Sequence, residues 1–218
     1  SREKILTLKK MNAMPLVNDS VMGVRGQLVT SGYGKTSYIR MYPTNLYLPA
    51  SYKTKRSSGN VKSGLCAAFI SDIHIGSDTF MSKEWGDFIN WLNGRGLKDK
   101  ADEELLKRIK YLVICGDLVD GIGIFPGQDK ELEIADIYGQ YEALGKELEK
   151  IPEHIEVIII PGNHDAIRPS EPQPAFPEKY ARLFPKRVHN LSNPARFKLE
   201  GVDVLAYHGR GFDDLAMS

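Results

Sequence analysis

The sequence lacks the features that mark disulfide-stapled, secreted and membrane-spanning proteins. It has two cysteines in 218 residues, Cys66 and Cys115, and both lie in apolar runs where a small buried thiol is expected. No stretch approaches the roughly 18 consecutive apolar residues of a membrane span, and the first residues lack the apolar core of a secretory signal. The sequence therefore argues against a disulfide scaffold or a zinc finger, and we expect a soluble, unsecreted protein.

Net charge is also nearly absent, but the two signs are unevenly distributed. The chain carries 29 basic and 28 acidic residues, a formal charge of +1. Residues 1–64 hold eleven basic and two acidic residues, which leaves 18 basic and 26 acidic residues for the remainder. A segment of charge +9 followed by one of −8 indicates a polyanion-binding module beside a carboxylate-rich site. A solvated surface with a basic linker explains the same charges equally well.

Two kinds of pattern divide the chain. Residues 21–48 contain two short strand-like runs around a glycine-rich turn, which predicts a β-hairpin. From residue 65 onward, apolar strands alternate with amphipathic helices, and this alternation predicts a layered α/β domain. We therefore expect a small β-domain within residues 1–50, a polar basic linker over 51–64 and an α/β domain over 65–218.

Residue types that bind metals follow each predicted strand of the α/β domain. The apolar strands are residues 65–70, 111–115 and 157–160, and a later hairpin covers 196–207. The residues that follow are Asp72 and His74, then Asp117 and Asp120, then Asn163, His164 and Asp165, and finally His208. Because ligands bind outside the carboxyl ends of strands in α/β sheets, these residues should converge. One such residue alone is usually a turn residue, but four successive clusters favour a site.

The residue types in these clusters indicate the chemistry. Carboxylates, imidazoles and an amide oxygen suit divalent Mn, Fe, Zn or Ni rather than calcium. A carboxylate that bridges two cations holds them roughly 3.5–4 Å apart, and such a pair clamps a phosphoryl group and activates water for in-line attack. The clusters thus predict phosphoester hydrolysis, whereas the choice among monoesters, diesters and phosphoproteins stays open.

Three short motifs carry a resemblance to a known superfamily. They are Asp-Ile-His at 72–74, Gly-Asp-Leu-Val-Asp at 116–120 and Gly-Asn-His-Asp at 162–165. In this order, and each after an apolar strand, they match the D-x-H, G-D-x-x-D and G-N-H-D signature of the calcineurin-like metallophosphoesterases. The chain therefore resembles this superfamily.

Further segments narrow the resemblance. Residues 69–77, the insert at 121–129 and the run at 207–214 resemble the small subunits of archaeal family D DNA polymerases, as does the basic β-segment that precedes them. The resemblance implies a phosphoesterase-type layered β-sandwich flanked by helices, preceded by part of an oligonucleotide-binding (OB-like) β-domain.

The resemblance also assigns metal ligands. Asp72 and His74 would bind a first ion, Asp117 would bridge, and Asn163 and His208 would bind a second ion. The implied cofactors are two divalent metal ions, with manganese the leading candidate and Fe, Zn, Ni and Mg as alternatives.

Three further residues receive roles beside the ions. His164 would act at the scissile phosphate, stabilising charge or protonating the leaving oxygen. Asp165 would orient His164, and Asp120 would hold the loop and the imidazoles as a hydrogen-bond acceptor outside the ligand set.

The implied function is a metal-dependent 3′ to 5′ exonuclease that proofreads for an archaeal replicative DNA polymerase in the cytoplasm, at the nucleoid. Its partners would be the large catalytic subunit and single-stranded or primer-template DNA, with no membrane. Aromatic and basic residues of the β-module suit single-stranded DNA, and the candidate contacts are Arg25, Lys35, Arg40, Lys53, Lys55 and Arg56. A non-catalytic accessory subunit and a stand-alone metallophosphatase or phosphodiesterase remain alternatives.

One element of the signature is missing from the sequence. The superfamily's last motif, G-H-x-H, supplies one histidine to each metal and does not occur before Ser218. We therefore expect the α/β domain to be incomplete at its C-terminal side, with weak metal binding and little activity for this chain alone.

Overall fold

The structure is a computed structural model that describes residues 23–33, 36–47 and 64–212. The chain divides into two compact units, one made of residues 1–57 with 211–218 and the other of residues 58–210. The expected basic linker at 51–64 lies outside the described residues, apart from its last residue. No helix in the described part of the chain is long and apolar enough to cross a membrane.

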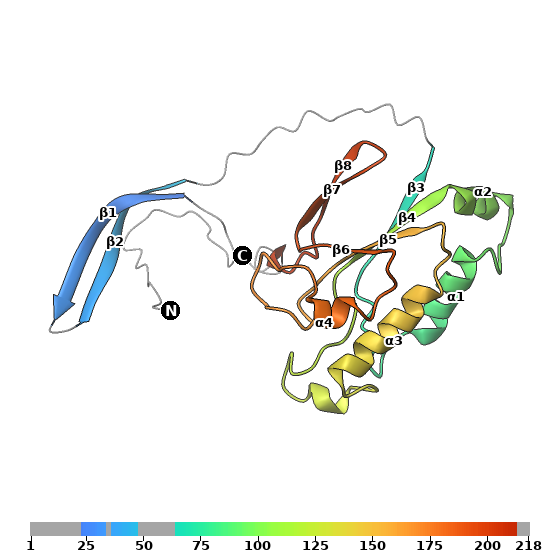
Figure 1. Cartoon of the computed structure of the whole chain (residues 1–218), viewed down its shortest axis with the longest axis horizontal. Coiled ribbons are helices and arrows are strands. Elements are labelled where there is room, and N and C mark those ends of the chain that lie inside the picture. The colour runs from blue at the N-terminus through green and yellow to red at the C-terminus, as the bar shows by residue number, and fades with distance from the viewer. Residues whose placement is uncertain (1–22, 34–35, 48–63, 213–218) are drawn as a thin grey trace. The chain divides into compact units, whose positions relative to one another are not determined.

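The first unit contains the predicted hairpin. Strand β1 (Gly23–Tyr33) pairs antiparallel with β2 (Thr36–Tyr47), as the blue ribbons of Figure 1 show. Arg25 lies on β1 with an exposed side chain, and Arg40 belongs to β2. The other predicted DNA contacts lie outside the described residues; they are Lys35, Lys53, Lys55 and Arg56.

The second unit is built on a parallel sheet of four strands. Its order is β3 (Cys66–Ile70), β4 (Ile109–Cys115), β5 (Glu156–Ile160) and β6 (Val188–Asn190). The three predicted apolar runs thus form three neighbouring strands. The central strands β4 and β5 are covered on both faces, which explains why their sequences are continuously apolar. Strand β3 lies at the edge of the sheet and leaves Phe69 53% exposed.

Alternate residues of the central strands contact two different layers. Leu112, Ile114, Val157 and Ile159 belong to one buried cluster with the helices, whereas Val113, Ile158 and Ile160 belong to another with the hairpin of β7 (Ala195–Leu199) and β8 (Val202–Ala206). The second unit is therefore a layered mixed α/β structure, with helices on one face of the sheet and an antiparallel hairpin on the other.

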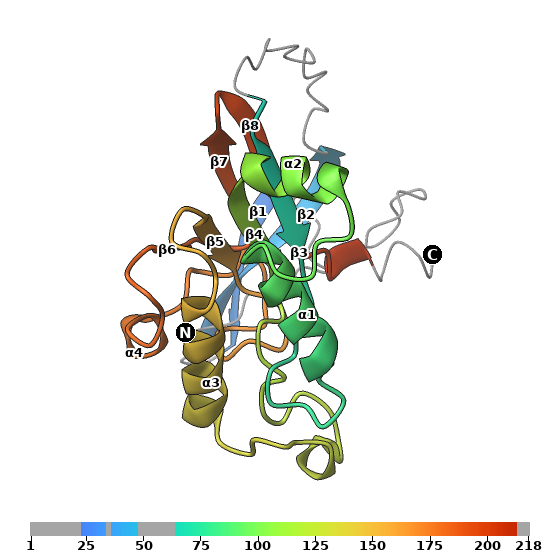
Figure 2. The same cartoon turned by 90° about the vertical axis from the view of Figure 1, so that its right-hand side faces the viewer.

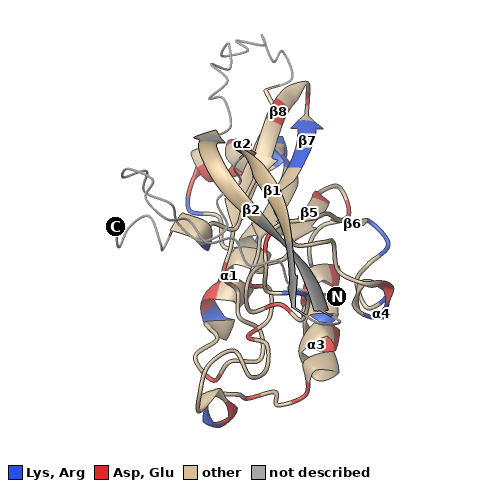
Figure 3. Cartoon of the chain, turned by 90° about the vertical axis from the view of Figure 1, so that its left-hand side faces the viewer, with Lys and Arg blue, Asp and Glu red and all other residues tan. Residues whose placement is uncertain are grey.

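The two longest helices are amphipathic, as predicted. Helix α1 (Ser82–Leu92) buries Trp85, Ile89 and Leu92, and α3 (Ile137–Glu149) buries a stripe that includes Tyr141. Figure 2 shows both helices on the same side of the sheet. The shorter elements are α2 (Lys100–Arg108), the 3-10 helix η1 (Gln128–Lys130) and α4 (Glu178–Ala181). The acidic surplus of this part of the chain is spread over the unit, with acidic segments on α1, α3 and α4 in Figure 3.

Candidate metal centre

The loops that follow β3 and β4 run side by side and carry the first two motifs. The amide of Asp72 donates to the carbonyl of Gly116 at 3.0 Å, and the amide of His74 donates to the carbonyl of Asp117 at 3.1 Å. Parallel pairing thus continues beyond the strand ends. It brings two motifs that are some forty residues apart in sequence to one edge of the sheet, as expected.

The backbone holds these side chains in an uncommon conformation. Asp72, His74 and Asp117 have φ angles of 57°, 53° and 50°, in the left-handed region that L-residues rarely occupy. Among the described residues, the other non-glycine residue of this kind is Glu200, in the turn between β7 and β8. Because such conformations cost about 1–3 kcal/mol each, the surrounding structure must compensate for them. Three predicted ligands are therefore fixed by the fold.

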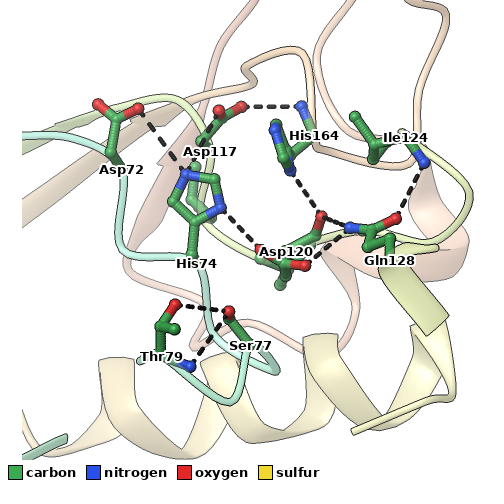
Figure 4. A network of polar contacts seen from close by, with 12 residues as sticks. Asp72, His74, Ser77, Thr79, Asp117, Asp120, Ile124, Gln128 and His164 are labelled. Atoms are coloured by element: carbon green, nitrogen blue, oxygen red, sulfur yellow. Dashed lines mark hydrogen bonds and ion pairs between the residues drawn. The ribbon is translucent and has the colours of Figure 1, made fainter. Parts of the chain in front are cut away.

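His74 lies among three carboxylates (Figure 4). Its Nε2 atom is 3.6 Å from Asp117 Oδ2 and 3.9 Å from Asp72 Oδ1, and its Nδ1 atom is 3.0 Å from Asp120 Oδ1. Because Nδ1 donates its proton to Asp120, the lone pair of Nε2 is directed toward Asp72 and Asp117. A histidine whose second nitrogen donates to a carboxylate is typical of metal sites, and Asp120 makes the contact expected of it.

His208 occupies the other side of Asp117. Its Nδ1 donates to the carbonyl of Cys115 at 2.9 Å, while Nε2 lies 3.1 Å from Asn163 Oδ1 and 3.4 Å from Asp117 Oδ1. Burial lowers the pKa of His208, but the carboxylate of Asp117 outweighs this effect and raises the pKa to about 9. A proton on Nε2 therefore lies between two oxygens, where a divalent cation would bind in its place.

Asp117 connects the two histidines. It is 3% exposed, its Oδ2 faces His74 and its Oδ1 faces His208. Burial acts to raise the pKa of Asp117, but hydrogen bonds from His208 and from the backbone amide of His164 hold it below its ordinary value. Asp117 thus stays charged and offers one oxygen to each side, which is the geometry of a bridging ligand.

The ligand atoms are close enough to hold cations. Two groups have all their ligand atoms within 4.8 Å of one another, namely His74, Asp117 and His164, and Asp72, Asp117 and His208. Both groups share Asp117, but they divide the other residues differently from the prediction, because Asp72 is grouped with His208 and His164 with His74. The structure therefore brings together every predicted ligand, including Asn163 beside His208, and the donor set fits two divalent ions.

Two glycines permit this close approach. A Cβ atom on Gly162 would collide with the carboxylate and the backbone nitrogen of Asp117, and one on Gly116 would collide with the ring of His208. Gly116 also has a φ of 91°. The glycines that begin two of the motifs are therefore required by packing, because any side chain there would separate the ligand loops.

His164 belongs to the group that contains His74 and Asp117. Its Nδ1 donates to the carbonyl of Asp120 at 2.8 Å, and its ring packs edge-on against that of His74 with centroids 4.6 Å apart. The Nε2 atom is therefore left to face the ligands or a substrate. This arrangement suits either a ligand or the predicted acid at the scissile phosphate.

Asp165 does not orient His164, so that part of the prediction is wrong. Asp165 is 3% exposed and its carboxylate binds elsewhere. Four donors surround it within 3.4 Å: the backbone amides of Gly162, Leu118 and Val119 and the hydroxyl of Tyr141. Burial raises the pKa of Asp165 to about 7, although these amide bonds oppose the shift. Its carboxylate joins the second and third motif loops, and the carbonyl of Asp120 orients His164 instead.

A buried glutamine that no motif predicts supports Asp120. Gln128 is 1% exposed, and its Nε2 donates to both the carbonyl and the Oδ2 of Asp120, at 2.9 and 2.7 Å. Its Oε1 accepts the amide of Ile124 at 2.9 Å. A glutamine at the start of a three-residue 3-10 helix carries no periodic signal, so only the structure reveals this support.

A pair of buried side-chain amides, Gln173 and Asn193, supports the side of the centre that contains His208. Asn193 Nδ2 donates to Gln173 Oε1 at 2.8 Å, and Asn193 Oδ1 accepts the amide of His208 at 3.0 Å. Gln173 Nε2 in turn donates to the carbonyl of Gly162 at 3.0 Å. This pair links the loop of His208 to the loop of Asn163, and no pattern in the sequence predicts it.

Comparison with known proteins identifies the family. The family model for the B subunits of DNA polymerases alpha and epsilon matches residues 67–217, which include all the motif residues above. The chain belongs to this family.

The relatives of the chain are archaeal polymerase subunits. The chain is 44% identical to the DNA polymerase II small subunit of Archaeoglobus fulgidus. The aligned segment has 203 residues and covers 93% of this chain and 39% of that protein. It is 42% identical to the corresponding subunit of Methanocaldococcus jannaschii, covering 90% of this chain and 32% of the relative. It is 51% identical over 153 residues to the corresponding subunit of Methanothermobacter thermautotrophicus, and this alignment covers 69% of this chain and 32% of the relative. The chain thus spans roughly a third of the length of these relatives.

Proposed function

We propose that the α/β unit is a two-metal phosphodiesterase that acts as the 3′ to 5′ exonuclease of a replicative DNA polymerase. The observation that carries this proposal is the position of Asp117. A buried, charged carboxylate presents one oxygen to His74 and the other to His208. Two cations bridged in this way are a recurring arrangement for in-line displacement at phosphorus.

The fold that this proposal requires is the calcineurin-like layered β-sandwich. A parallel sheet with helices on one face and the β7–β8 hairpin on the other supports it. In this assignment residues 65–218 belong to the phosphoesterase domain, residues 1–50 to an OB-like domain and residues 51–64 to a basic linker.

Two divalent ions, manganese first among the candidates, would be held on the two sides of the Asp117 carboxylate. When bound, they would supply Lewis acidity toward the phosphate and an activated water. Asp72 and His74 would hold one ion, Asn163 and His208 the other. The Nδ1 contacts of both histidines, to Asp120 and to the Cys115 carbonyl, would keep each Nε2 available as a ligand.

The protein's own contribution to the reaction centres on His164. A water oxygen forms a bond to phosphorus while the bond from phosphorus to the 3′ oxygen of the preceding nucleotide breaks. His164 Nε2 would donate a proton to that leaving oxygen or stabilise the charge on the phosphate. The products are a nucleoside 5′-monophosphate and a strand that ends in a 3′ hydroxyl.

DNA is the proposed substrate because the relatives are named as DNA polymerase subunits and because the first part of the chain is basic. The exposed Arg25 on β1 lies in that segment. A small subunit implies a large catalytic partner, and the proposed complex would place the exonuclease where it can remove misincorporated nucleotides.

The test is degradation of end-labelled single-stranded DNA in manganese by the full-length protein and its Asp117→Asn variant. We expect stepwise shortening from the 3′ end by the parent and none by the variant. Asp87→Asn is the matched control, because Asp87 is an exposed residue on α1 paired with Lys83.

Three other results would count against the proposal. Equal degradation by the parent and by Asp117→Asn would show that the nuclease lies elsewhere. No degradation of DNA by a parent that still assembles with the large subunit would favour a non-catalytic accessory role. If the parent hydrolyses only a small aryl phosphodiester, the metal chemistry stands but DNA is not the substrate.

A further inference from the structure

A pocket opens beside Asp72 and His74, two of the predicted metal ligands. Its volume is about 540 Å³, within the range of small-molecule sites. It is lined by the loop that carries Asp72 and His74, by the first half of α1, and by Asp120 and Phe125 from the segment after β4. The pocket therefore adjoins the metal centre on the side of His74.

The pocket is acidic as well as apolar. Glu84 and Glu131 line it together with Asp120, and none of the described residues that line it is a lysine or arginine. A phosphate that entered here would be repelled by these carboxylates. The pocket thus suits an uncharged part of a substrate, with carboxylates available to accept hydrogen bonds from amino groups.

Aromatic rings form much of its apolar surface. Trp85 and Phe88 come from α1, and their centroids lie 5.9 Å apart. Phe125 comes from the insert after the second motif and is 40% exposed. Rings from two separate elements line one pocket, which is a surface suited to a flat aromatic ligand.

Phe125 is held in place although it is exposed. Phe125 and the residue before it both bond to the buried Gln128. The backbone amide of Ile124 donates to Gln128 Oε1, and the backbone amide of Gln128 donates to the Phe125 carbonyl at 3.3 Å. The Phe125 ring lies 6.5 Å from the ring of His164. An exposed ring on an anchored loop next to the reaction centre is preorganised to contact a substrate.

We propose that this pocket receives the nucleobase of the terminal nucleotide, stacked on Phe125, while the phosphate of that nucleotide lies at the metal centre. The inference depends on the proposed exonuclease function. A base is joined to its phosphate through a single sugar, so a base site must adjoin the phosphate site. The described residues that line the pocket include no lysine or arginine, so the pocket favours the uncharged base, whereas the anionic phosphate is favoured at the metal centre.

The test compares two single-stranded oligonucleotides as substrates of the full-length protein. One ends in a 3′ thymidine, and the other is identical except that its 3′-terminal residue is abasic. Base stacking on an aromatic ring is worth about 1–3 kcal/mol, or roughly 5- to 150-fold. We expect the parent to remove the thymidine nucleotide with a kcat/KM larger by such a factor. Phe125→Ala should lose that advantage, and Phe125→Trp should retain it.

Controls separate this role from others. Phe69 is 53% exposed on β3 and is not part of the pocket, so Phe69→Ala should keep the thymidine preference. If Phe125→Ala slows both oligonucleotides equally, or weakens assembly with the large subunit at an unchanged preference, the base site is refuted. If the parent removes no nucleotide but hydrolyses an aryl phosphodiester, the exonuclease function itself fails and the inference falls with it.

Discussion

Asp117 and Asp165 are equally buried, at 3% exposure, yet their surroundings differ. Each lies just beyond a strand of the parallel sheet. The oxygens of Asp117 face two imidazoles, whereas those of Asp165 are surrounded by backbone amides and a tyrosine hydroxyl. The pKa of Asp117 is lowered, and that of Asp165 is raised to about 7. Burial alone therefore does not identify a functional carboxylate, but the kind of partner does.

The difference separates the two tasks of the motif loops. Asp165 binds one loop to the next and has no described contact with the imidazoles. Asp117 is held in place by that junction, through the loop that Asp165 anchors, and directs both its oxygens into the centre. Substitutions of the two aspartates should accordingly affect different properties of the protein.

The largest expected effect is on activity when Asp117 is changed. Asp117→Asn keeps the shape of the side chain but weakens both proposed cation sites at once. We expect kcat/KM to fall by about 10³-fold, above the roughly 10- to 100-fold loss typical of outer partners of metal ligands. The unfolding free energy, measured by denaturant titration, should change much less. A large loss of stability with retained activity would show that Asp117, like Asp165, has a structural role.

The largest expected effect on stability comes from Asp165→Ala. This change leaves three backbone amides and the Tyr141 hydroxyl without their acceptor. Unsatisfied buried donors cost about 1–3 kcal/mol each when they stay dry, so we expect a loss of about 3 kcal/mol after relaxation. Denaturant titration measures it. Asp203→Ala, at an exposed aspartate near Arg196, should change stability by less than about 0.5 kcal/mol.

Asp120→Asn should have a smaller effect that is confined to one side of Asp117. The amide can still accept from His74 Nδ1 but carries no charge, and it presents a donor toward Gln128 Nε2 in one of its two orientations. We expect roughly 10- to 100-fold weaker binding of one manganese ion, measured by titration calorimetry, with the second ion unaffected. Asp129→Asn, exposed in the same loop, is the control. An equal loss of affinity for both ions would contradict the assignment of Asp120 to one of two separate metal sites.

The smallest effect is the pH dependence of metal binding at His208. Burial acts to lower the pKa of His208, but the carboxylate of Asp117 raises it to about 9, above its ordinary value of 6.5. The raised pKa contributes stability that is present below pH 6.5 and lost as the pH rises through 9. A cation needs the neutral ring, so below about pH 9 binding should release a proton, and affinity should rise by up to about tenfold per pH unit until that pH is reached. Titration calorimetry in buffers with different enthalpies of ionisation measures the number of protons released. His189→Gln should preserve it and His208→Gln abolish it.

Much of the fold could be predicted from the sequence because its signals are local. Continuous apolar runs predicted β3, β4 and β5, the alternation of strands with amphipathic helices predicted the layered α/β unit, and the hairpin expected over 196–207 is formed by β7 and β8. The convergence of the motif residues also followed, since the carboxyl ends of parallel strands share one edge of a sheet.

The contacts within the site were less predictable. Spacing placed Asp165 next to His164 along the chain, but the turn of the loop directs its carboxylate toward the amides of the neighbouring motif. Gln173 and Asn193 lie in irregular loops, and Gln128 begins the three-residue 3-10 helix η1, so none of them belongs to a periodic sequence. Their importance comes from complete burial, which depends on tertiary packing and leaves no trace in local composition.

The distance of His208 from the other motifs has a consequence for biosynthesis. A ribosome makes the chain from its N-terminus, so Asp72, His74, Asp117 and Asn163 all emerge before the β7–β8 hairpin that leads to His208. The nascent chain can therefore assemble the group around His74 while the group around His208 is still incomplete. Translation itself sets the order in which the two halves of the centre become competent to load metal, and the second half cannot form until synthesis has passed this hairpin.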